Sequence, residues 1–572
     1  MKKFTIKNTE QILKEKTLLF ATWMCENNNW EFFKSWSVGF NKLFKEVILF
    51  DPRKKTFELG QEAMKKKFFE IVGKQKPDYV LLLPDCGDFG IGLIEKINKI
   101  SPLTKTIVYS GDDDFAFELS SRYYALFVDY YLVAQTDYIH DYKKDGLKNT
   151  MPFYNAAIIN FKPLNLKKKY DVSFIGSSLA PRIPVMKYLI DKKVNVGLWG
   201  HGWINYPEFK KVYKGIPNGE EFAKIVNQSK INISFSKNDV GEPHFKARVL
   251  ECAATKSFQL IDYFPGYLKY FKENEEIVMF KDKEDLTNKI KYYLSHEKER
   301  EEIAEKAYRK TIEEYSFSAQ INKVFQKILM EESTFSRKNL PKINKKVAKI
   351  TKEIFINDRK KIEEDLKKVS YVYFSQGKQH NMEHRVYLQA YSLEKTKKEI
   401  SCCDYSIYSK YLGDYLVFKT SRRAIENLKK KEFNKLLNIN QFLVSKKYFL
   451  ENFQKFKKIF EGKEIDFVNK ENTAFIDIPL VRIGKLPKGA RECLNGFEKE
   501  KLEKAFYLSF LIKISHFLYQ KSPLFLFFTF HLVVLSLINQ DIFILKNLFA
   551  STVDKNNWSK LKNAKEAYCT AS

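Results

Sequence analysis

Short apolar runs, rich in branched and aromatic residues, recur about every 25 to 30 residues in the first part of the chain, and no other property limits its fold so strongly. The stretches between them are rich in Lys and Glu with helical spacing, as at 62–71 and 92–100. Such an alternation of strands and helices predicts a parallel sheet. The expected strands are TLLFATWM (17–24), EVILFD (46–51), DYVLLLP (78–84), TIVYS (106–110) and YYLVAQ (130–135).

A second series of the same kind follows a polar break, PLNLKKK, at 163–169. We therefore predict an α/β protein with two Rossmann-like domains, at residues 1–165 and 166–332, and a cleft between them as the natural ligand site. The length of 572 residues agrees with two or three domains. The second set of strands is DVSFIG (171–176), VNVGLWG (194–200), INISF (231–235), FQLID (258–262) and EIVMF (276–280).

The region after the second domain, residues 333–572, is expected to be a mostly α-helical accessory region. A polar, basic stretch at 331–346 suits a linker, and amphipathic runs follow at 347–369 and 415–460, with a possible strand at 474–483. The apolar segment 523–538 has sixteen residues, fewer than the roughly 20 that a membrane span needs. We expect it to form a buried or membrane-surface helix.

The chain carries 99 Lys and Arg against 70 Asp and Glu, a net charge of +29. Such a field attracts phosphate-bearing ligands or an anionic membrane surface, although coding bias alone could also produce it. No helix-turn-helix, zinc-finger or aromatic RNA-binding pattern is present, so nucleic acid is not the expected partner.

Seven cysteines without regular spacing form neither a disulfide framework nor a zinc signature. The charged residues Glu10, Lys14, Glu15 and Lys16 interrupt the first apolar stretch, which is too short for a signal peptide. We expect a cytoplasmic protein, with peripheral attachment to the inner face of the cell membrane as a further option.

The most informative stretch runs from 241 to 317. A loop with Glu242 leads into a helix that carries Lys246, Arg248 and Glu251. A helix start at the cleft offers free backbone N–H groups and a positive dipole end, where a diphosphate binds without a metal. Because Glu251 lies three residues after Arg248, the two share a helix face, and the carboxylate could take both hydroxyls of a ribose.

The runs KARVLECAATKSFQLIDYFPG, EEIVMFKDKEDLTNKIKYYL and EREEIAEKAYRKTIEEYSF resemble the carboxyl-terminal domain of CgeB-like (spore maturation protein) glycosyltransferases, relatives of glycosyltransferase family 4. The resemblance covers about 80 residues well and 105–320 loosely, and leaves 333–572 outside. It implies a GT-B fold, in which two Rossmann-like domains face each other and the second holds most of the nucleotide-sugar.

By this resemblance Glu251 matches the ribose-contacting glutamate of the family, and Arg248 matches the arginine three residues before it. Family 4 relatives also carry a Glu-x7-Glu motif whose first glutamate contacts the transferred sugar. Here eight residues separate Glu242 from Glu251, so the spacing departs by one. Glu242 is therefore either a catalytic residue beside Arg248 or a solvated loop carboxylate.

Gly176 and Ser177 follow an expected strand, and Arg182 comes soon after. This resembles the family loop that approaches the diphosphate, which would add these residues to Lys246 and Glu251 in the donor site. The alternative is an ordinary turn between a strand and a helix with a surface arginine.

The motif GDDDF (111–115) stands at the end of an expected strand. Acids at this edge commonly line a ligand site, so Asp112 and Asp114 are candidates for the acceptor cleft or for capping the next helix. An Asp-x-Asp metal site, as in the other glycosyltransferase fold, is the alternative. His201 in WGHGW either faces the cleft or lies on a surface loop.

Two further patterns are taken as coincidental. HNMEH (380–384) fits the zinc pattern H-x-x-E-H, but no third ligand is identifiable. Cys402 and Cys403 are adjacent, which disfavours shared ligation of one metal, and nothing marks either as a catalytic thiol.

We therefore expect a glycosyltransferase of the hexosyltransferase class (EC 2.4) that needs no cofactor or metal. Lys246, Arg248, Arg182 and the helix dipole would stabilise the leaving diphosphate. The resemblance suggests retention of anomeric configuration, and a surface glycan, a lipid-linked glycan or a protein as acceptor. The alternative is an inactive GT-B-like binding or scaffold protein at the membrane surface.

Overall fold

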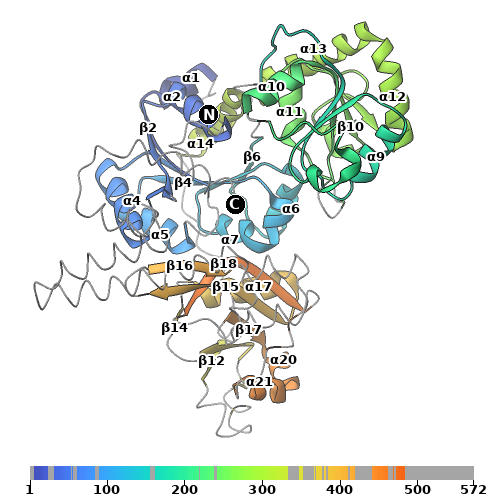
Figure 1. Cartoon of the computed structure of the whole chain (residues 1–572). Coiled ribbons are helices and arrows are strands. Elements are labelled where there is room, and N and C mark those ends of the chain that lie inside the picture. The colour runs from blue at the N-terminus through green and yellow to red at the C-terminus, as the bar shows by residue number, and fades with distance from the viewer. Residues whose placement is uncertain are drawn as a thin grey trace, which may run out of the picture.

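The computed structural model of the chain builds three sheets, and Figure 1 shows how they are arranged. Among the described residues, no helix is long and apolar enough to cross a membrane. The structure describes residues 6–22, 31–52, 54–55, 61–83, 89–154, 161–217, 219–237, 241, 243–332, 347–351, 362, 366–367, 369–375, 379–381, 384–409, 413–418, 441–460, 465, 468 and 472–483.

The first domain holds a six-stranded parallel sheet in the order β2-β1-β3-β4-β5-β6. Its strands read as continuous apolar runs because helices cover both faces. The strands are β1 (Thr17–Ala21), β2 (Glu46–Phe50), β3 (Tyr79–Leu82), β4 (Lys105–Ser110), β5 (Tyr130–Val133) and β6 (Thr150–Pro152).

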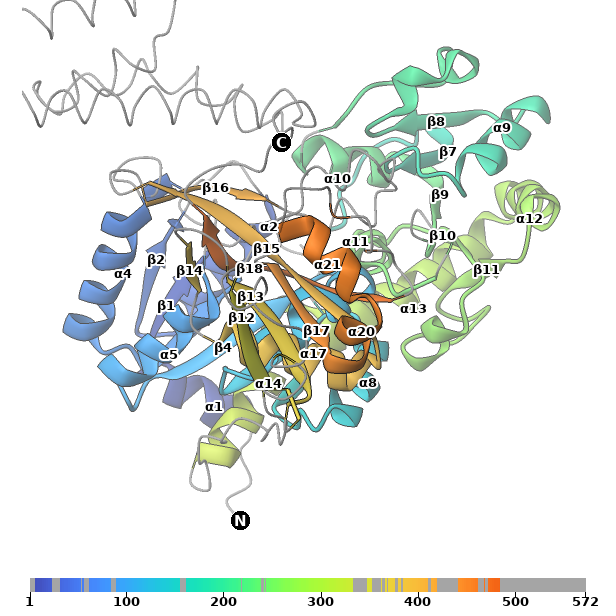
Figure 2. The ribbon, with the colours of Figure 1, turned by 90° about the horizontal axis from the view of Figure 1, so that it is seen from below.

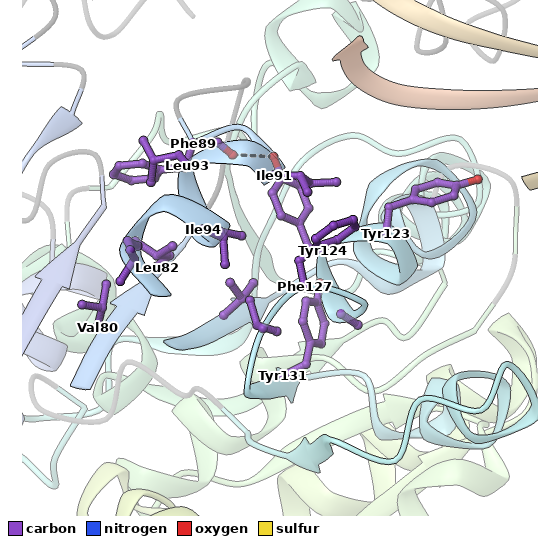
Figure 3. Packing of buried hydrophobic residues seen from close by; sticks show 14 of the residues in the cluster. Val80, Leu82, Phe89, Ile91, Leu93, Ile94, Tyr123, Tyr124, Phe127 and Tyr131 are labelled. Carbon is purple, nitrogen blue, oxygen red and sulfur yellow. Dashed lines mark hydrogen bonds between the residues drawn. The ribbon is translucent and has the colours of Figure 1, made fainter. Parts of the chain in front are cut away.

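One face of this sheet packs against α4 (Gln61–Gln75) and α5 (Ile91–Ile100). Figure 3 shows this core, in which Val80 and Leu82 of β3 lie toward Ile94 of α5. The Tyr124 hydroxyl donates to the carbonyl oxygen of Phe89 at 2.8 Å, which satisfies a polar group inside the apolar cluster.

The second domain holds a five-stranded parallel sheet in the order β11-β10-β9-β7-β8, so the predicted pair of Rossmann-like sheets is confirmed. Its strands are β7 (Tyr170–Ile175), β8 (Val196–Trp199), β9 (Ser229–Ser234), β10 (Gln259–Asp262) and β11 (Val278–Phe280). Its helices are α9 (Ile183–Asp191), α10 (Gly219–Asn227), α11 (Ala247–Ala254), α12 (Lys283–Ser295) and α13 (Glu297–Tyr315).

The chain leaves β7 toward β8 on one side and leaves β9 toward β10 on the other. In open parallel sheets, a ligand binds outside the carboxyl ends of the two strands where the connections diverge. The connections after β7 and β9 are therefore the parts of this domain in which to look for a site.

Helix α14 (Phe317–Glu332) follows the second domain in sequence but packs on the first. Phe325 lies against Tyr79 and Phe44 with ring centroids 4.9 and 5.2 Å away, and Phe317 lies 5.7 Å from Trp36. In Figure 1 the helix lies beside α1 (Ile6–Leu13) and α2 (Glu31–Leu43). It therefore closes the second face of the first sheet.

The third domain differs from the helical region that we expected after residue 332. Its described residues build a seven-stranded mixed sheet in the order β12-β13-β17-β15-β18-β14, with β16 paired to β15. The helices are α17 (Arg385–Thr396), α20 (Lys446–Glu451) and α21 (Phe453–Phe460). The strands are β12 (Val347–Thr351), β13 (Tyr371–Ser375), β14 (Gln379–Asn381), β15 (Ile400–Ser409), β16 (Gly413–Phe418), β17 (Phe442–Ser445) and β18 (Thr473–Ile483).

The expected helix at 347–369 begins instead with β12. The expected helical run at 415–460 contains part of β16 and all of β17, and only its last part is helical, in α20 and α21. Pairing with distant strands, such as the parallel pairing of β12 with β13, overrides local helical preference here. The expected strand at 474–483 is confirmed as β18, whereas the segment 523–538 lies outside the described residues.

The third sheet lies across the first domain, and Figure 2 shows this from below, with the second domain to one side. Leu388, Tyr391 and Cys403 of the third domain belong to the apolar cluster that contains Tyr123 of the first domain. His384 Nε2 lies 2.6 Å from Glu95 Oε2 of α5, so a polar contact also joins the two domains.

Candidate active site

The loops after β7 and β8 interlock at the carboxyl edge of the second sheet. Gly176 N donates to Trp199 O at 2.9 Å, and the Trp203 indole donates to Gly176 O at 2.7 Å. Gly200 has φ +125°, and a Cβ there would lie 2.2 Å from Gly176 O. A glycine is therefore required at position 200, and the two loops hold each other in one arrangement.

Ser177 and Arg182 lie on the loop that Gly176 begins. Arg182 Nη1 donates to Ser177 O at 3.1 Å, and its guanidinium lies 5.7 Å from the Phe174 ring and 5.9 Å from the Phe235 ring. Arg182 is only 9% exposed, so it is not the surface arginine of the alternative interpretation. It therefore lies buried beside the loop that Gly176 begins, at the carboxyl edge of the second sheet.

Helix α11 brings Arg248 and Glu251 together, as their spacing predicted. Arg248 Nε lies 3.2 Å from Glu251 Oε2, and the guanidinium carbon lies 3.8 Å from the centre of the Phe222 ring on α10. The aromatic ring fixes the plane of the guanidinium through a cation–π contact.

The hydrogen-bonding groups of this pair are only partly satisfied. Arg248 Nη1 is buried and has no hydrogen-bond partner within the described part of the chain. Burial raises the pKa of Glu251, and the neighbouring Arg248 guanidinium opposes that rise. A buried guanidinium nitrogen without a partner is costly, and an anionic ligand would satisfy it.

Lys246 precedes α11 with an extended backbone, and its ammonium contacts His244 Nε2. The loop that carries both residues folds back, since His244 N donates to Ser236 O at 3.2 Å. Glu242 lies in the same connection but outside the described residues. The start of α11 therefore brings two cations, Lys246 and Arg248, to one end of the sheet, and Glu251 follows one turn along the helix.

Two polar residues near this helix, His244 and Asp262, were not predicted from the sequence. Asp262 ends β10, is buried, and accepts a hydrogen bond from Ser236 N at 2.5 Å. Burial raises the pKa of Asp262, and its hydrogen bonds to Ser236 lower it. Asp262 could have been predicted from the sequence, because it is an acid at the end of the apolar run FQLID, just as Asp112 follows an apolar run.

The three acceptor-side candidates lie in two different domains. Asp112 is exposed after β4 in the first domain, and His201 is exposed after β8 in the second. Asp114 lies in α6 (Asp113–Ala116), and its side chain is outside the described residues. The acid that turns inward from this motif is Asp113, which is 1% exposed.

The first two domains touch through side-chain hydroxyls. The Tyr154 hydroxyl donates to Thr136 Oγ1 at 2.6 Å and also contacts the Tyr270 hydroxyl of the second domain. Lys269 Nζ lies 2.5 Å from Asp137 Oδ1 across the same boundary. Phe245, next to Lys246, packs on Tyr154 and Tyr270, so the loop before α11 is anchored at this contact.

Metal ligands do not gather in the described residues: no group of three or more His, Cys, Asp or Glu side chains there could hold an ion. In HNMEH, His384 contacts Glu95 and packs 4.8 Å from the Phe127 ring, so it belongs to the interface with the first domain. Cys402 and Cys403 are both buried.

Residues 184–326 match a family model described as glycosyl transferase-like. No curated protein matches the sequence. Similar solved structures include Anabaena HepE in complex with UDP-glucose, with 11% identity over 55% of this chain and 100% of that chain and a TM-score of 0.41.

Two others are TarM from S. aureus and the pneumococcal O-GlcNAc transferase GtfA in complex with UDP and GlcNAc. TarM has 12% identity over 47% of this chain and 58% of its own, with a TM-score of 0.35. GtfA has 12% identity over 48% of this chain and 60% of its own, with a TM-score of 0.34. At such TM-scores the fold assignment rests on the strand order and not on these likenesses.

The family match covers most of the second domain, including α10, α11 and the loop between β9 and α11. It therefore contains Arg248, Glu251 and Phe222, the three side chains whose contacts fix the charged face of α11. Residues 184–326 are a glycosyl transferase-like segment of the chain.

Proposed function

We propose that this chain is a nucleotide-sugar-dependent glycosyltransferase of the GT-B type. The observation that carries the proposal is the ion pair between Arg248, on the first turn of α11, and Glu251, one turn further along the helix, within the glycosyl transferase-like segment. The resemblance to CgeB-like enzymes supports the same function.

In the proposed reaction, the bond between the sugar and the diphosphate breaks, the oxygen of an acceptor hydroxyl bonds to the sugar carbon, and the proton of that hydroxyl passes to the departing diphosphate. The electron pair of the broken bond stays on the diphosphate, where negative charge develops. Lys246 at the start of α11 and Arg248, whose Nη1 has no hydrogen-bond partner among the described residues, would stabilise this charge together with the helix N-terminus. One well-placed donor of this kind contributes about 2.7–4 kcal/mol to transition-state stabilisation.

Glu251 would accept hydrogen bonds from the ribose hydroxyls. Arg182, whose Nη1 donates to Ser177 O in the loop that Gly176 begins, would lie near the diphosphate. We further propose a hexosyl donor, no requirement for a metal, and retention of configuration, with Glu242 as the candidate sugar contact. These points rest on the resemblance.

We place the reaction in the cytoplasm, or at the inner face of the membrane, in the assembly of a surface glycan or glycoprotein. The net charge of +29 supports attraction to an anionic surface or to phosphate-bearing substrates. The acceptor is then a glycan, a lipid-linked glycan or a protein.

The test is thermal unfolding of the full chain with UDP, GDP, ADP or CMP and their sugars, with and without Mn²⁺. A nucleotide at 100 times its dissociation constant adds about 2.7 kcal/mol of stability. We expect a metal-independent shift with one nucleotide, lost in Glu251→Ala and kept in Glu313→Ala, which changes an exposed glutamate on α13.

Transfer or hydrolysis of the matching nucleotide-sugar then separates an enzyme from an inactive binding protein. No shift with any nucleotide would overturn the donor site. A shift that depends on Mn²⁺ would contradict the metal-independent mechanism and direct attention to Asp112 and Asp114.

A further inference from the structure

A cavity of about 370 Å³ lies where α17 of the third domain meets the first domain. Its first-domain lining comes from three consecutive helical pieces after β4, namely α6, the π-helix η1 (Phe117–Ser121) and α7 (Arg122–Ala125), and from α8 (Ile139–Lys144). In Figure 1, α6 and α7 lie at the boundary with the third domain. A π-helical turn is rare and is often found at functional sites.

Asp113 is the buried acid of this cavity. Its Oδ1 accepts hydrogen bonds from the Ser110 hydroxyl at 3.0 Å and the Tyr142 hydroxyl at 2.9 Å. Its Oδ2 is buried and makes no hydrogen bond of ordinary geometry with any described residue. A ligand that donates a hydrogen bond would satisfy this oxygen.

Arg122 is held on the opposite side by two carboxylates. Its Nη1 donates to Glu118 Oε2 at 2.9 Å, and its Nε lies 3.1 Å from Asp145 Oδ2. The guanidinium lies 4.4 Å from the centre of the Phe117 ring. Lys395 of α17 completes this network, since its Nζ lies 3.4 Å from Asp145 Oδ1.

The charges that line the cavity nearly cancel. Four carboxylates, on Asp113, Glu118, Asp141 and Asp145, face three cations, on Arg122, Lys144 and Lys395. A phosphate would lie close to these carboxylates and be repelled, whereas a neutral polyhydroxyl compound can donate to the carboxylates and accept from the cations.

Two aromatic rings line the cavity, but Phe117 is only 4% exposed and the Arg122 guanidinium lies on its ring, so the half-buried Tyr138 is the ring that a ligand can reach. Phe117 and Tyr138 both line it, and their ring centroids lie 5.6 Å apart. A sugar ring presents hydroxyls at its edge and C–H groups on its face, so charged groups beside aromatic rings match both parts of it.

Tyr138 also connects the cavity to the boundary with the second domain. It ends η2 (Thr136–Tyr138), in which Thr136 contacts Tyr270 and Asp137 pairs with Lys269. A molecule in the cavity therefore lies within one short helical turn of the contact between the two Rossmann-like domains.

We propose that this cavity binds a neutral sugar unit of the acceptor and that Lys395 of the third domain completes the site. The role as acceptor site rests on the proposed glycosyl transfer. The third domain then contributes to acceptor recognition.

Saturation-transfer NMR on the full chain, with methyl glycosides of glucose, galactose, mannose and N-acetylglucosamine, tests this proposal. We expect at least one glycoside to bind, and we expect Asp113→Asn, Lys144→Gln and Lys395→Gln each to weaken its binding about tenfold. Lys143→Gln is the matched control, because Lys143 is the exposed neighbour of Lys144 on α8 and does not line the cavity.

No saturation with any of the glycosides, or unchanged binding in the variants, would overturn the proposal. Tighter binding of glucose 6-phosphate than of methyl glucoside would contradict a neutral ligand. Lys144 is exposed, so its variant stays informative even if Asp113→Asn misfolds. The nucleotide shift of the same proteins is measured in parallel, so failure of the donor site and failure of this cavity are told apart.

Discussion

Asn322 Nδ2 donates to Glu10 Oε1 at 2.9 Å, although 312 residues separate them in the sequence. The bond joins α14 to α1 and marks the return of the chain from the second domain to the first. Around it, Ile321, Val324, Phe325 and Ile328 are buried in the cluster that contains Trp36 and Tyr79. The first domain is therefore complete only when α14 is in place.

Phe325→Ala should destabilise the protein by about 3–5 kcal/mol, because it removes a buried ring and leaves a cavity against Tyr79 and Phe44. Denaturant unfolding followed by fluorescence measures the loss. Lys327→Ala, on the exposed face of the same helix, should change stability by less than about 0.5 kcal/mol. Equal effects of the two changes would contradict the packing of α14 on the first sheet.

Gly200→Ala should destabilise the second domain more than Gly215→Ala does. Both glycines have positive φ, +125° and +100°, so alanine is strained at either position by about 1–3 kcal/mol. Only at Gly200 would the new Cβ also meet the Gly176 carbonyl oxygen, at 2.2 Å, whereas nothing lies within 4 Å at Gly215. Thermal unfolding of the two variants checks this order, and a larger loss at Gly215 would refute the interlocked loops.

Arg248→Lys should lower the rate of sugar transfer about 10²-fold. Lysine keeps the charge but loses the flat contact with Phe222 and the second guanidinium nitrogen. Steady-state kinetics of transfer measure the effect, and Arg309→Lys, at an exposed arginine of α13, is the control. If Arg248→Lys keeps full activity, the donor site does not depend on guanidinium geometry.

Asp113 should make stability fall as the pH rises from about 4 to 6. Burial raises the pKa of Asp113 from 3.8 to about 6, and the nearby hydroxyl groups of Ser121, Tyr142 and Ser110 limit the rise. Between these values the folded protein still holds the proton that the unfolded chain has lost, so unfolding releases a proton and stability decreases with pH, by about 3 kcal/mol in all.

Unfolding of Asp113→Asn over this pH range isolates the effect. The asparagine variant should gain stability relative to the wild type as the pH rises, while Asp191→Asn, at an exposed aspartate of α9, should track the wild type. Parallel pH profiles for all three proteins would show that folding does not change the pKa of Asp113.

The two parallel sheets could be predicted because their strands are buried on both faces and therefore read as short apolar runs, such as KTIVYS of β4. The Arg248–Glu251 contact could be predicted because three residues on a helix place two side chains on one face whatever the rest of the fold does. Both predictions depend only on residues that are close together in the sequence.

The rest depends on contacts between distant segments. In GDDDF the sequence offers three consecutive acids, and only the packing of α8, through the Tyr142 hydroxyl, shows that Asp113 turns inward. The third sheet was missed because strands such as VAKIT are short and lie in Lys-rich sequence with a weak alternating pattern. The parallel pairing of β15 with β18 joins segments about 70 residues apart, which no local pattern reveals.

The return of α14 to the first sheet also sets the order in which the chain can fold during synthesis. The clusters of the second domain draw on residues from Tyr154 to Tyr315, one continuous stretch, so they can close as soon as that stretch leaves the ribosome. The first domain must wait for α14 and then for Leu388, Tyr391 and Cys403. The domain that is translated first is therefore completed after the second, and until then its sheet faces stay open, at a synthesis rate of about 5–20 residues per second, and need protection by chaperones.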